Sequence, residues 1–132
     1  MGLMGSDRPG AVVVGAVLVE SGEVVGTCAV APEEPPEALG QLVSDRPAFR
    51  LRSMATAPKL QGSGIGSAVL DLAIAQVAER GGVLLWCNAR VPARRFYERA
   101  GFVAFGSEWI EEEIGPHIVM WRRVTQMKGD AR

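Results

Sequence analysis

The chain is poor in the residues that bind metals or cross-link small proteins. It has one histidine and two cysteines, Cys28 and Cys87, which lie far apart in apolar runs and lack the spacing of metal ligands. The sequence therefore predicts no metal site. We expect both thiols to be reduced and buried, which is typical of cytosolic proteins, so we predict a cytoplasmic location.

The sequence also lacks a large net charge of either sign and an apolar run long enough to cross a membrane. The net charge of −1 argues against a general nucleic-acid binder. The apolar run at residues 11–19 is too short to span a bilayer, and the N-terminus lacks the pattern of a signal peptide. A hydrophobic content of 48% is enough for one core. We therefore expect a single domain over residues 1–132, with no nucleic-acid or membrane partner.

The order of apolar runs predicts an α/β (α+β) fold. Strands are expected in β-branched or continuously apolar runs, at residues 12–19, 23–31, 49–56, 83–88, 102–109 and 117–124. Helices are expected at residues 64–80 and between Pro92 and Gly101. We expect residues 1–10 to be disordered, and the proline- and glutamate-rich residues 32–47 to form a mobile surface loop.

The strand–helix–strand unit at residues 49–88 predicts a central parallel strand pair in a mixed, mostly antiparallel twisted sheet. Ligands bind beyond the C-terminal ends of such strands, where neighbouring strands part. In the predicted fold, Thr56, the loop that follows it, and Asn88 therefore surround one crevice.

That loop contains the glycine-rich segment Gln61-Gly62-Ser63-Gly64-Ile65-Gly66. Glycines let a bulky group approach the main chain closely, and the first turn of a helix offers unpaired N–H groups with a partial positive charge. The segment therefore predicts a phosphate or pyrophosphate site. A Walker loop is excluded because no lysine stands before Ser67. A dinucleotide fingerprint is disfavoured because Ser67 replaces its third glycine.

The pattern Q/R-x-x-G-x-G/A fits the segment at every fixed position. Together with residues 54–60, it resembles motif A of the GNAT superfamily of acyl-CoA-dependent N-acetyltransferases. A second stretch, Ala93-Arg94-Arg95-Phe96-Tyr97-Glu98-Arg99-Ala100-Gly101-Phe102, is similar to the family's helix-to-strand motif A-x-x-FY-x-x-x-GF. The resemblance covers residues 12–124 and implies a GNAT-like sheet, splayed at its parallel unit to hold acetyl-CoA as acyl donor.

The resemblance also implies which residues bind the cofactor. The main chain of Met54 and Thr56 would contact the pantetheine arm, and the amides of residues 62–66 would hold the pyrophosphate. Asn88 is expected to bond the pantetheine, although capping a turn fits it equally well. Arg90 stands where many family members carry asparagine. The full implied set is Met54, Ala55, Thr56, Gln61, Gly62, Ser63, Gly64, Ile65, Gly66, Ser67 and Asn88.

Tyr97 and His117 are the predicted catalytic residues. The resemblance assigns Tyr97, the only tyrosine, to protonation of the departing CoA thiolate, whereas its place on an apolar helix face also fits simple packing. His117 is the only histidine, and an imidazole suits proton transfer near neutral pH, so we predict that it is the base. A solvated hairpin tip is the alternative for His117. The glutamates at residues 111–113 are expected to favour a cationic amine.

The expected function is transfer of an acetyl group from acetyl-CoA to a primary amine of a small molecule or protein. The alternative is a non-catalytic acyl-CoA-binding module, a sensor or partner subunit without an acceptor site. Tyr97 favours the enzyme, and a front that is short for the family favours the module. The short front makes the strand at residues 12–19 an apolar sheet edge, so we expect a homodimer formed through it. Truncation of a longer protein is the other explanation of the short front.

Overall fold

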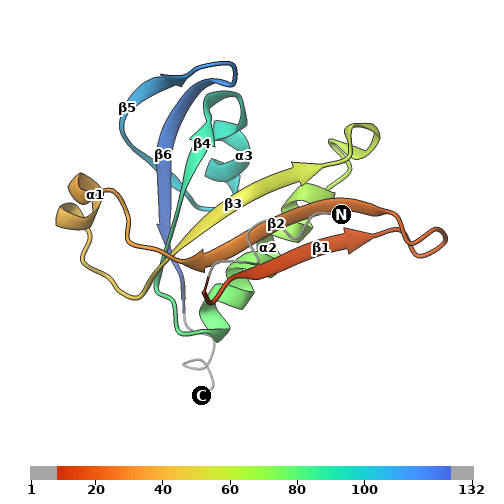
Figure 1. Cartoon of the computed structure of the whole chain (residues 1–132), viewed down its shortest axis with the longest axis horizontal. Helices are drawn as coiled ribbons and strands as arrows, with labels where there is room; N and C mark the ends of the chain where they lie inside the picture. The colour runs from red at the N-terminus through yellow and green to blue at the C-terminus, as the bar shows by residue number, and fades with distance from the viewer. Residues whose placement is uncertain (1–8, 126–132) are drawn as a thin grey trace.

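The computed structural model describes residues 9–125 of the chain. In this part six strands form one sheet with the order β1-β2-β3-β4-β6-β5, shown in Figure 1. The strands are β1 (Val12–Val17), β2 (Val24–Pro32), β3 (Ala48–Thr56), β4 (Leu84–Arg90), β5 (Val103–Glu111) and β6 (Gly115–Arg123). The helices are α1 (Glu37–Leu42), α2 (Ile65–Glu79) and α3 (Arg94–Arg99), with 3-10 turns η1 (Pro58–Leu60) and η2 (Val91–Ala93).

The strand pairing confirms a mixed, mostly antiparallel sheet. β3 and β4 run parallel and are joined by α2, while the other neighbouring strands pair antiparallel. The predicted strand–helix–strand unit therefore lies in the middle of the sheet. β1 lies at one edge and pairs, within residues 9–125, only with β2.

The central parallel pair is short, and this opens the sheet. β3 and β4 pair over three residues, ending with Arg50 opposite Trp86. Beyond that point β3 stays paired with β2 as far as Thr56, and β4 stays paired with β6 as far as Arg90. Because each strand follows its other neighbour, the two strands diverge, as Figure 1 shows. The splay expected for this fold is present.

Helix α2 covers one face of the sheet and buries Val69, Leu70, Ala73 and Val77 completely. Gly26 on β2 permits this approach, since a Cβ there would lie 2.9 Å from the Ile65 side chain. A Cβ on Gly66 would likewise lie 3.2 Å from Thr56 Oγ1 and 3.4 Å from the Phe96 ring. The first turn of α2 is therefore held between the end of β3 and α3, at the open end of the sheet.

The opposite face of the sheet carries a second, smaller core, made of Leu39, Val43, Ala48, Leu84, Trp86 and Val119. Leu39 and Val43 belong to the segment for which we expected a loop, and α1 lies there instead. Their spacing of four residues puts both on one face of a helical turn, and their burial stabilises a helix too short to form alone.

Two further expectations concern order and membranes. Most of the N-terminal segment for which we expected disorder, residues 1–8, lies outside the described part of the chain. Between residues 9 and 125, no helix has the length and apolar content needed to cross a bilayer.

Candidate active site

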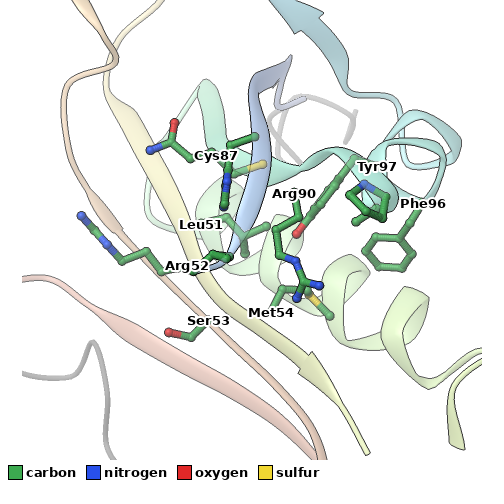
Figure 2. A pocket seen from close by; sticks show the side chains of 13 residues that line it. Leu51, Arg52, Ser53, Met54, Cys87, Arg90, Phe96 and Tyr97 are labelled. Carbon is green, nitrogen blue, oxygen red and sulfur yellow. The ribbon is translucent and has the colours of Figure 1, made fainter. Parts of the chain in front are cut away.

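A cavity of about 490 Å³ lies where β3 and β4 part. Its walls come from β3, β4, α3 and the β5–β6 hairpin, and Figure 2 shows the side chains that line it. A second cavity of about 440 Å³ extends along β3 to the glycine-rich segment. The two cavities share Met54, Arg90, Ala93 and Phe96 as lining residues, so they form one continuous crevice.

The glycine-rich segment enters α2 with most of its main-chain N–H groups unpaired. Gly62 and Gly64 have φ of +87° and +93°, which residues with side chains rarely adopt. Within the described residues, no hydrogen bond is donated by the amides of Gly62, Gly64, Ile65, Gly66 and Ser67. These donors, with the partial positive charge at the N-terminus of the 15-residue α2, suit a phosphate group.

Ser63 differs from the other predicted phosphate donors. Its amide donates to the main-chain carbonyl of Leu60 at 3.1 Å, and its hydroxyl donates to the same oxygen. Both groups are therefore used inside the turn that precedes α2. This corrects the prediction that the Ser63 amide is free to bind pyrophosphate.

Among the predicted cofactor residues, Asn88 lines the first cavity, and the others fall into two groups. Those that line the second cavity are Met54, Ala55, Thr56, Gln61, Gly62 and Gly66. Ser63, Gly64, Ile65 and Ser67 line neither of these cavities, and the Ile65 side chain packs against the core. Gln61 Nε2 donates a hydrogen bond to the Thr56 carbonyl at 3.4 Å. The side chain of Gln61 therefore occupies a main-chain group that we expected to contact the pantetheine arm.

β3 carries a bulge at the cavity that the sequence did not predict. Its register with β2 shifts between Thr27 and Ala29, and Ser53 has a φ of +61°. A bulge re-aims the side chains around it. As a result Leu51 and Met54, three residues apart, both pack on the α2 face of the sheet.

Tyr97 packs with its ring and offers its hydroxyl to the cavity. The ring lies edge-on to Phe96 and Phe102, with centroids 5.1 Å and 5.3 Å away. The hydroxyl makes no hydrogen bond with residues 9–125, and Figure 2 shows it directed from α3 into the cavity. Burial, with a smaller effect of Cys87 and Cys28, raises the pKa of Tyr97, so the phenol keeps its proton at neutral pH. The ring therefore packs against its aromatic neighbours, as an apolar helix face predicts, and the hydroxyl is available as a donor.

His117 is buried at the start of β6 and does not lie at a solvated hairpin tip. It lies opposite Arg90 in the β4–β6 ladder, and its ring stacks on Trp109 with centroids 5.7 Å apart. Nδ1 lies 2.9 Å from the Gly115 carbonyl oxygen, which can only accept, so Nδ1 carries the proton. In the neutral ring Nε2 is then an acceptor. His117 and Tyr97 line the same cavity, so the structure brings the two predicted catalytic residues together.

The glutamates at residues 111–113 lie outside the cavity wall. All three are exposed on the β5–β6 hairpin, and none lines either cavity. Glu111 accepts a hydrogen bond from Trp109 Nε1 at 2.8 Å. The acidic rim expected for the acceptor site is therefore not part of its wall, which Ile114 lines instead.

This combination of loop, splayed sheet and crevice occurs in a known family. The Acetyltransferase (GNAT) domain family matches residues 12–104, more than half of the chain. The chain belongs to the GNAT family. A curated relative is an uncharacterized N-acetyltransferase, YitI, of Bacillus subtilis (strain 168), which is 31% identical over 101 residues. The match covers 76% of this chain and 64% of that protein, so the chain spans less than two thirds of its relative.

Solved GNAT structures share the fold. A protein of Desulfovibrio desulfuricans assigned to the GNAT acetyltransferases superposes with a TM-score of 0.68 at 27% identity, covering 89% of this chain and 70% of that one. An aminoglycoside 6′-N-acetyltransferase complexed with coenzyme A also gives a TM-score of 0.68, covering 89% of this chain and 75% of that one. Its identity is 16%, so this second likeness shows the fold alone.

In this GNAT domain, Arg52 and Arg90 line the cavity, although the sequence pattern predicts a role for neither. A signal for Arg52 was present, because arginines at 50 and 52 alternate with the buried Phe49 and Leu51 along β3. Such alternation places arginines on the face of the sheet opposite α2. The pattern does not show that this face borders a cavity, because the cavity exists only where β3 and β4 diverge.

Cys87 also lines the cavity of the GNAT domain, but it is no nucleophile. Burial raises the pKa of its thiol to about 12, despite the opposing effect of the Arg50 charge. Burial likewise raises the pKa of Cys28 to about 12. Both thiols therefore stay protonated, and both cysteines are free and buried as the sequence predicts.

Proposed function

We propose that this GNAT domain is a cytoplasmic N-acetyltransferase that transfers an acetyl group from acetyl-CoA to a primary amine of a small molecule or protein. The observation that supports this function is the continuous crevice between the unpaired amides before α2 and the cavity that Tyr97 and His117 share. Membership of the GNAT family and the likeness to a fold solved with coenzyme A agree with it.

The residues of the crevice suit a coenzyme A thioester. The diphosphate fits the unpaired amides at the start of α2, and Gln61 adds no charge there. Beyond Arg50 and Trp86, the facing edges of β3 and β4 have no strand partner among residues 9–125, so their main-chain groups suit the amides of the pantetheine arm. When bound, the thioester supplies an activated acyl carbonyl.

His117 is the base in this proposal. An alkylammonium has a pKa of about 10.4, so freeing its lone pair at pH 7 costs about 4.6 kcal/mol. Nε2 of the neutral ring accepts this proton, because Nδ1 already donates to the Gly115 carbonyl. The same Nδ1 hydrogen bond keeps the ring in place when it becomes positively charged.

Tyr97 stabilises the departing thiolate. Because burial raises the pKa of the phenol, its complete deprotonation by a thiolate with a thiol pKa of about 8.5 is uphill. The hydroxyl therefore donates a hydrogen bond to the sulfur and keeps its proton, which refines the predicted role of Tyr97 as a full proton donor. A preorganised donor of this kind contributes about 10²–10³ in rate.

The second candidate is a non-catalytic acyl-CoA-binding module that acts as a sensor or partner subunit. Such a module would use the same crevice but needs no base at its acceptor end. His117, whose Nε2 is the accepting nitrogen, lines the same cavity as Tyr97 with its unpaired hydroxyl, and this favours the enzyme.

Calorimetry and a thiol-release assay test the proposal. We expect acetyl-CoA to bind, NAD not to bind, and at least one primary amine to accelerate CoA release above the rate of hydrolysis. Binding of acetyl-CoA without amine-stimulated release would favour the module. Failure of acetyl-CoA to bind would overturn both candidates.

A further inference from the structure

Arg52 and Asn88 occupy matching positions on the two sides of the gap between β3 and β4. Each lies two residues beyond Arg50 or Trp86, the last pair of the parallel ladder. Since side chains alternate between the faces of a strand, both point to the face that carries Trp86, opposite α2. Figure 2 shows Arg52 leaving β3 on the side away from Tyr97. Both residues line the first cavity and not the second, so they belong to the end remote from the phosphate loop.

The first cavity as a whole carries a net positive charge. The Glu33 carboxylate accepts hydrogen bonds from Arg52 at 2.7 Å and from Arg50 at 3.2 Å, so one negative charge serves two guanidinium groups. Arg90 also lines the cavity and forms no ion pair with residues 9–125. Among the residues that line the first cavity there is no aspartate or glutamate.

Arg52 is both held in place and able to bind a ligand. Its hydrogen bond to Glu33 uses Nη1, and a guanidinium has further N–H donors in a planar fork. The side chain is only 22% exposed, so an anion that reaches it is partly shielded from water. A cation already fixed by a neighbouring carboxylate loses little conformational freedom when it binds an anion.

We propose that the acceptor is a small amine that also carries a carboxylate, as an amino acid does, and that Arg52 binds this carboxylate. The inference rests on the proposed N-acetyltransferase function and names its substrate class. A planar carboxylate matches the guanidinium fork, and the Asn88 amide across the gap offers a further donor. The positive charges of Arg52 and Arg90 also disfavour the ammonium form of the amine and so help His117 to remove its proton.

The test compares amino acids with their carboxamides as acceptors, because each pair differs only at the group that Arg52 is proposed to bind. The amine of the carboxamide is less basic, so without recognition of the carboxylate the carboxamide would be the better acceptor. We expect kcat/KM for CoA release to favour the amino acid by about tenfold or more, as for a hydrogen bond between charged groups.

Variants of Arg52 assign the preference to this residue. We expect Arg52→Gln to raise KM for the amino acid about tenfold, to remove the preference over the carboxamide and to leave KM for acetyl-CoA unchanged. Arg52→Lys keeps the charge and should keep part of the preference. Arg95→Gln is the matched control, because Arg95 is exposed on α3 and lines neither cavity.

A carboxamide that reacts as well as its amino acid, or a preference that survives in Arg52→Gln, would overturn the inference and leave the proposed function intact. The comparison in the unaltered protein holds even if a variant does not fold. If no amine is acetylated, the proposed function fails, and calorimetry with the CoA-loaded protein still tests the carboxylate site. Selective binding of the amino acid, lost in Arg52→Gln, would support the site. Equal binding of both compounds, or none, would overturn it.

Discussion

Arg50 and Trp86 form the last pair of the parallel ladder between β3 and β4, and the guanidinium carbon of Arg50 lies 4.9 Å from the centre of the Trp86 ring. Glu33, the residue that follows β2, joins the same cluster. Its carboxylate accepts from Arg50, and its main-chain carbonyl accepts from Trp86 Nε1 at 3.0 Å. These contacts hold β3 and β4 together at the point from which they diverge.

Glu33→Gln should destabilise the fold in a pH-dependent way. Burial tends to raise the pKa of Glu33, but hydrogen bonds and charges from Arg52 and Arg50 outweigh it, so the pKa lies below its ordinary value of 4.5. The ionised Glu33 carboxylate therefore stabilises the folded state fully above pH 4.5, and this contribution is lost as the pH falls through the lowered pKa. We expect the free energy of unfolding in urea to fall by roughly 1–2 kcal/mol at pH 7.

The difference between Glu33→Gln and the unaltered protein should shrink as the pH falls below 4.5. Glu34→Gln is the control, because the Glu34 side chain is 74% exposed and its ion pair with Arg46 is solvated. A difference that stays constant between pH 7 and pH 3 would mean that the ionised carboxylate is not what stabilises the cluster.

Tyr97→Phe should lower kcat by about 10²–10³-fold, because it removes a donor to the departing sulfur and keeps the ring contacts. KM for acetyl-CoA should not change. Steady-state kinetics of CoA release measure both constants. Phe102→Leu is the control for packing, since Phe102 contacts the Tyr97 ring and lines neither cavity. Equal kcat in Tyr97→Phe and the unaltered protein would remove Tyr97 from the mechanism.

His117→Ala should lower kcat/KM by about 10²–10⁴-fold, since the amine then loses its base. Free imidazole, which fits the space left by the side chain, should restore part of the rate. Trp109→Phe is the control, because it keeps an aromatic ring beside His117 and leaves the Nδ1 hydrogen bond intact. Full activity in His117→Ala would assign the base to another group or to water.

Gln61 variants test the phosphate end of the crevice. Gln61→Arg adds a positive charge beside the unpaired amides and Gln61→Glu adds a negative one. We expect coenzyme A to bind more tightly and more weakly, respectively, by about 0.5–1 kcal/mol at low salt. Calorimetry measures the affinities, and pantetheine, which lacks the diphosphate, is the control ligand. If each variant changed the affinity for pantetheine as much as the affinity for coenzyme A, the diphosphate would not lie at this loop.

We also propose that a second copy of the chain pairs with the edge strand β1. Val13 and Val17 are 40% and 56% exposed on this strand, and a charge on an edge strand opposes pairing. Sedimentation should therefore show a dimer that Val13→Lys with Val17→Lys converts to a monomer. Leu72→Lys, at an exposed position on α2, should leave the dimer intact. A monomeric unaltered protein, well above micromolar concentration, would contradict the proposal.

Much of the fold could be predicted because it depends on local patterns. The β-branched runs, the glycines before α2 and the short helix before Phe102 each encode a backbone conformation within a few residues. The helix α1 was missed, since proline and glutamate mask the spacing of Leu39 and Val43. The bulge at Ser53 has no local signal, because it arises from the register of β3 against β2.

By itself the sequence determined the order of the six strands and of the helices α2 and α3, and it made the glycine-rich segment, Tyr97 and His117 the candidates for the site. Only the tertiary structure decided that β3 and β4 separate after Arg50 and Trp86. That separation depends on how far each strand pairs with its outer neighbour, which is a property of several distant segments together. It brings Arg52, Tyr97 and His117, from three different elements, to the wall of one cavity, and no spacing along the chain encodes such a meeting.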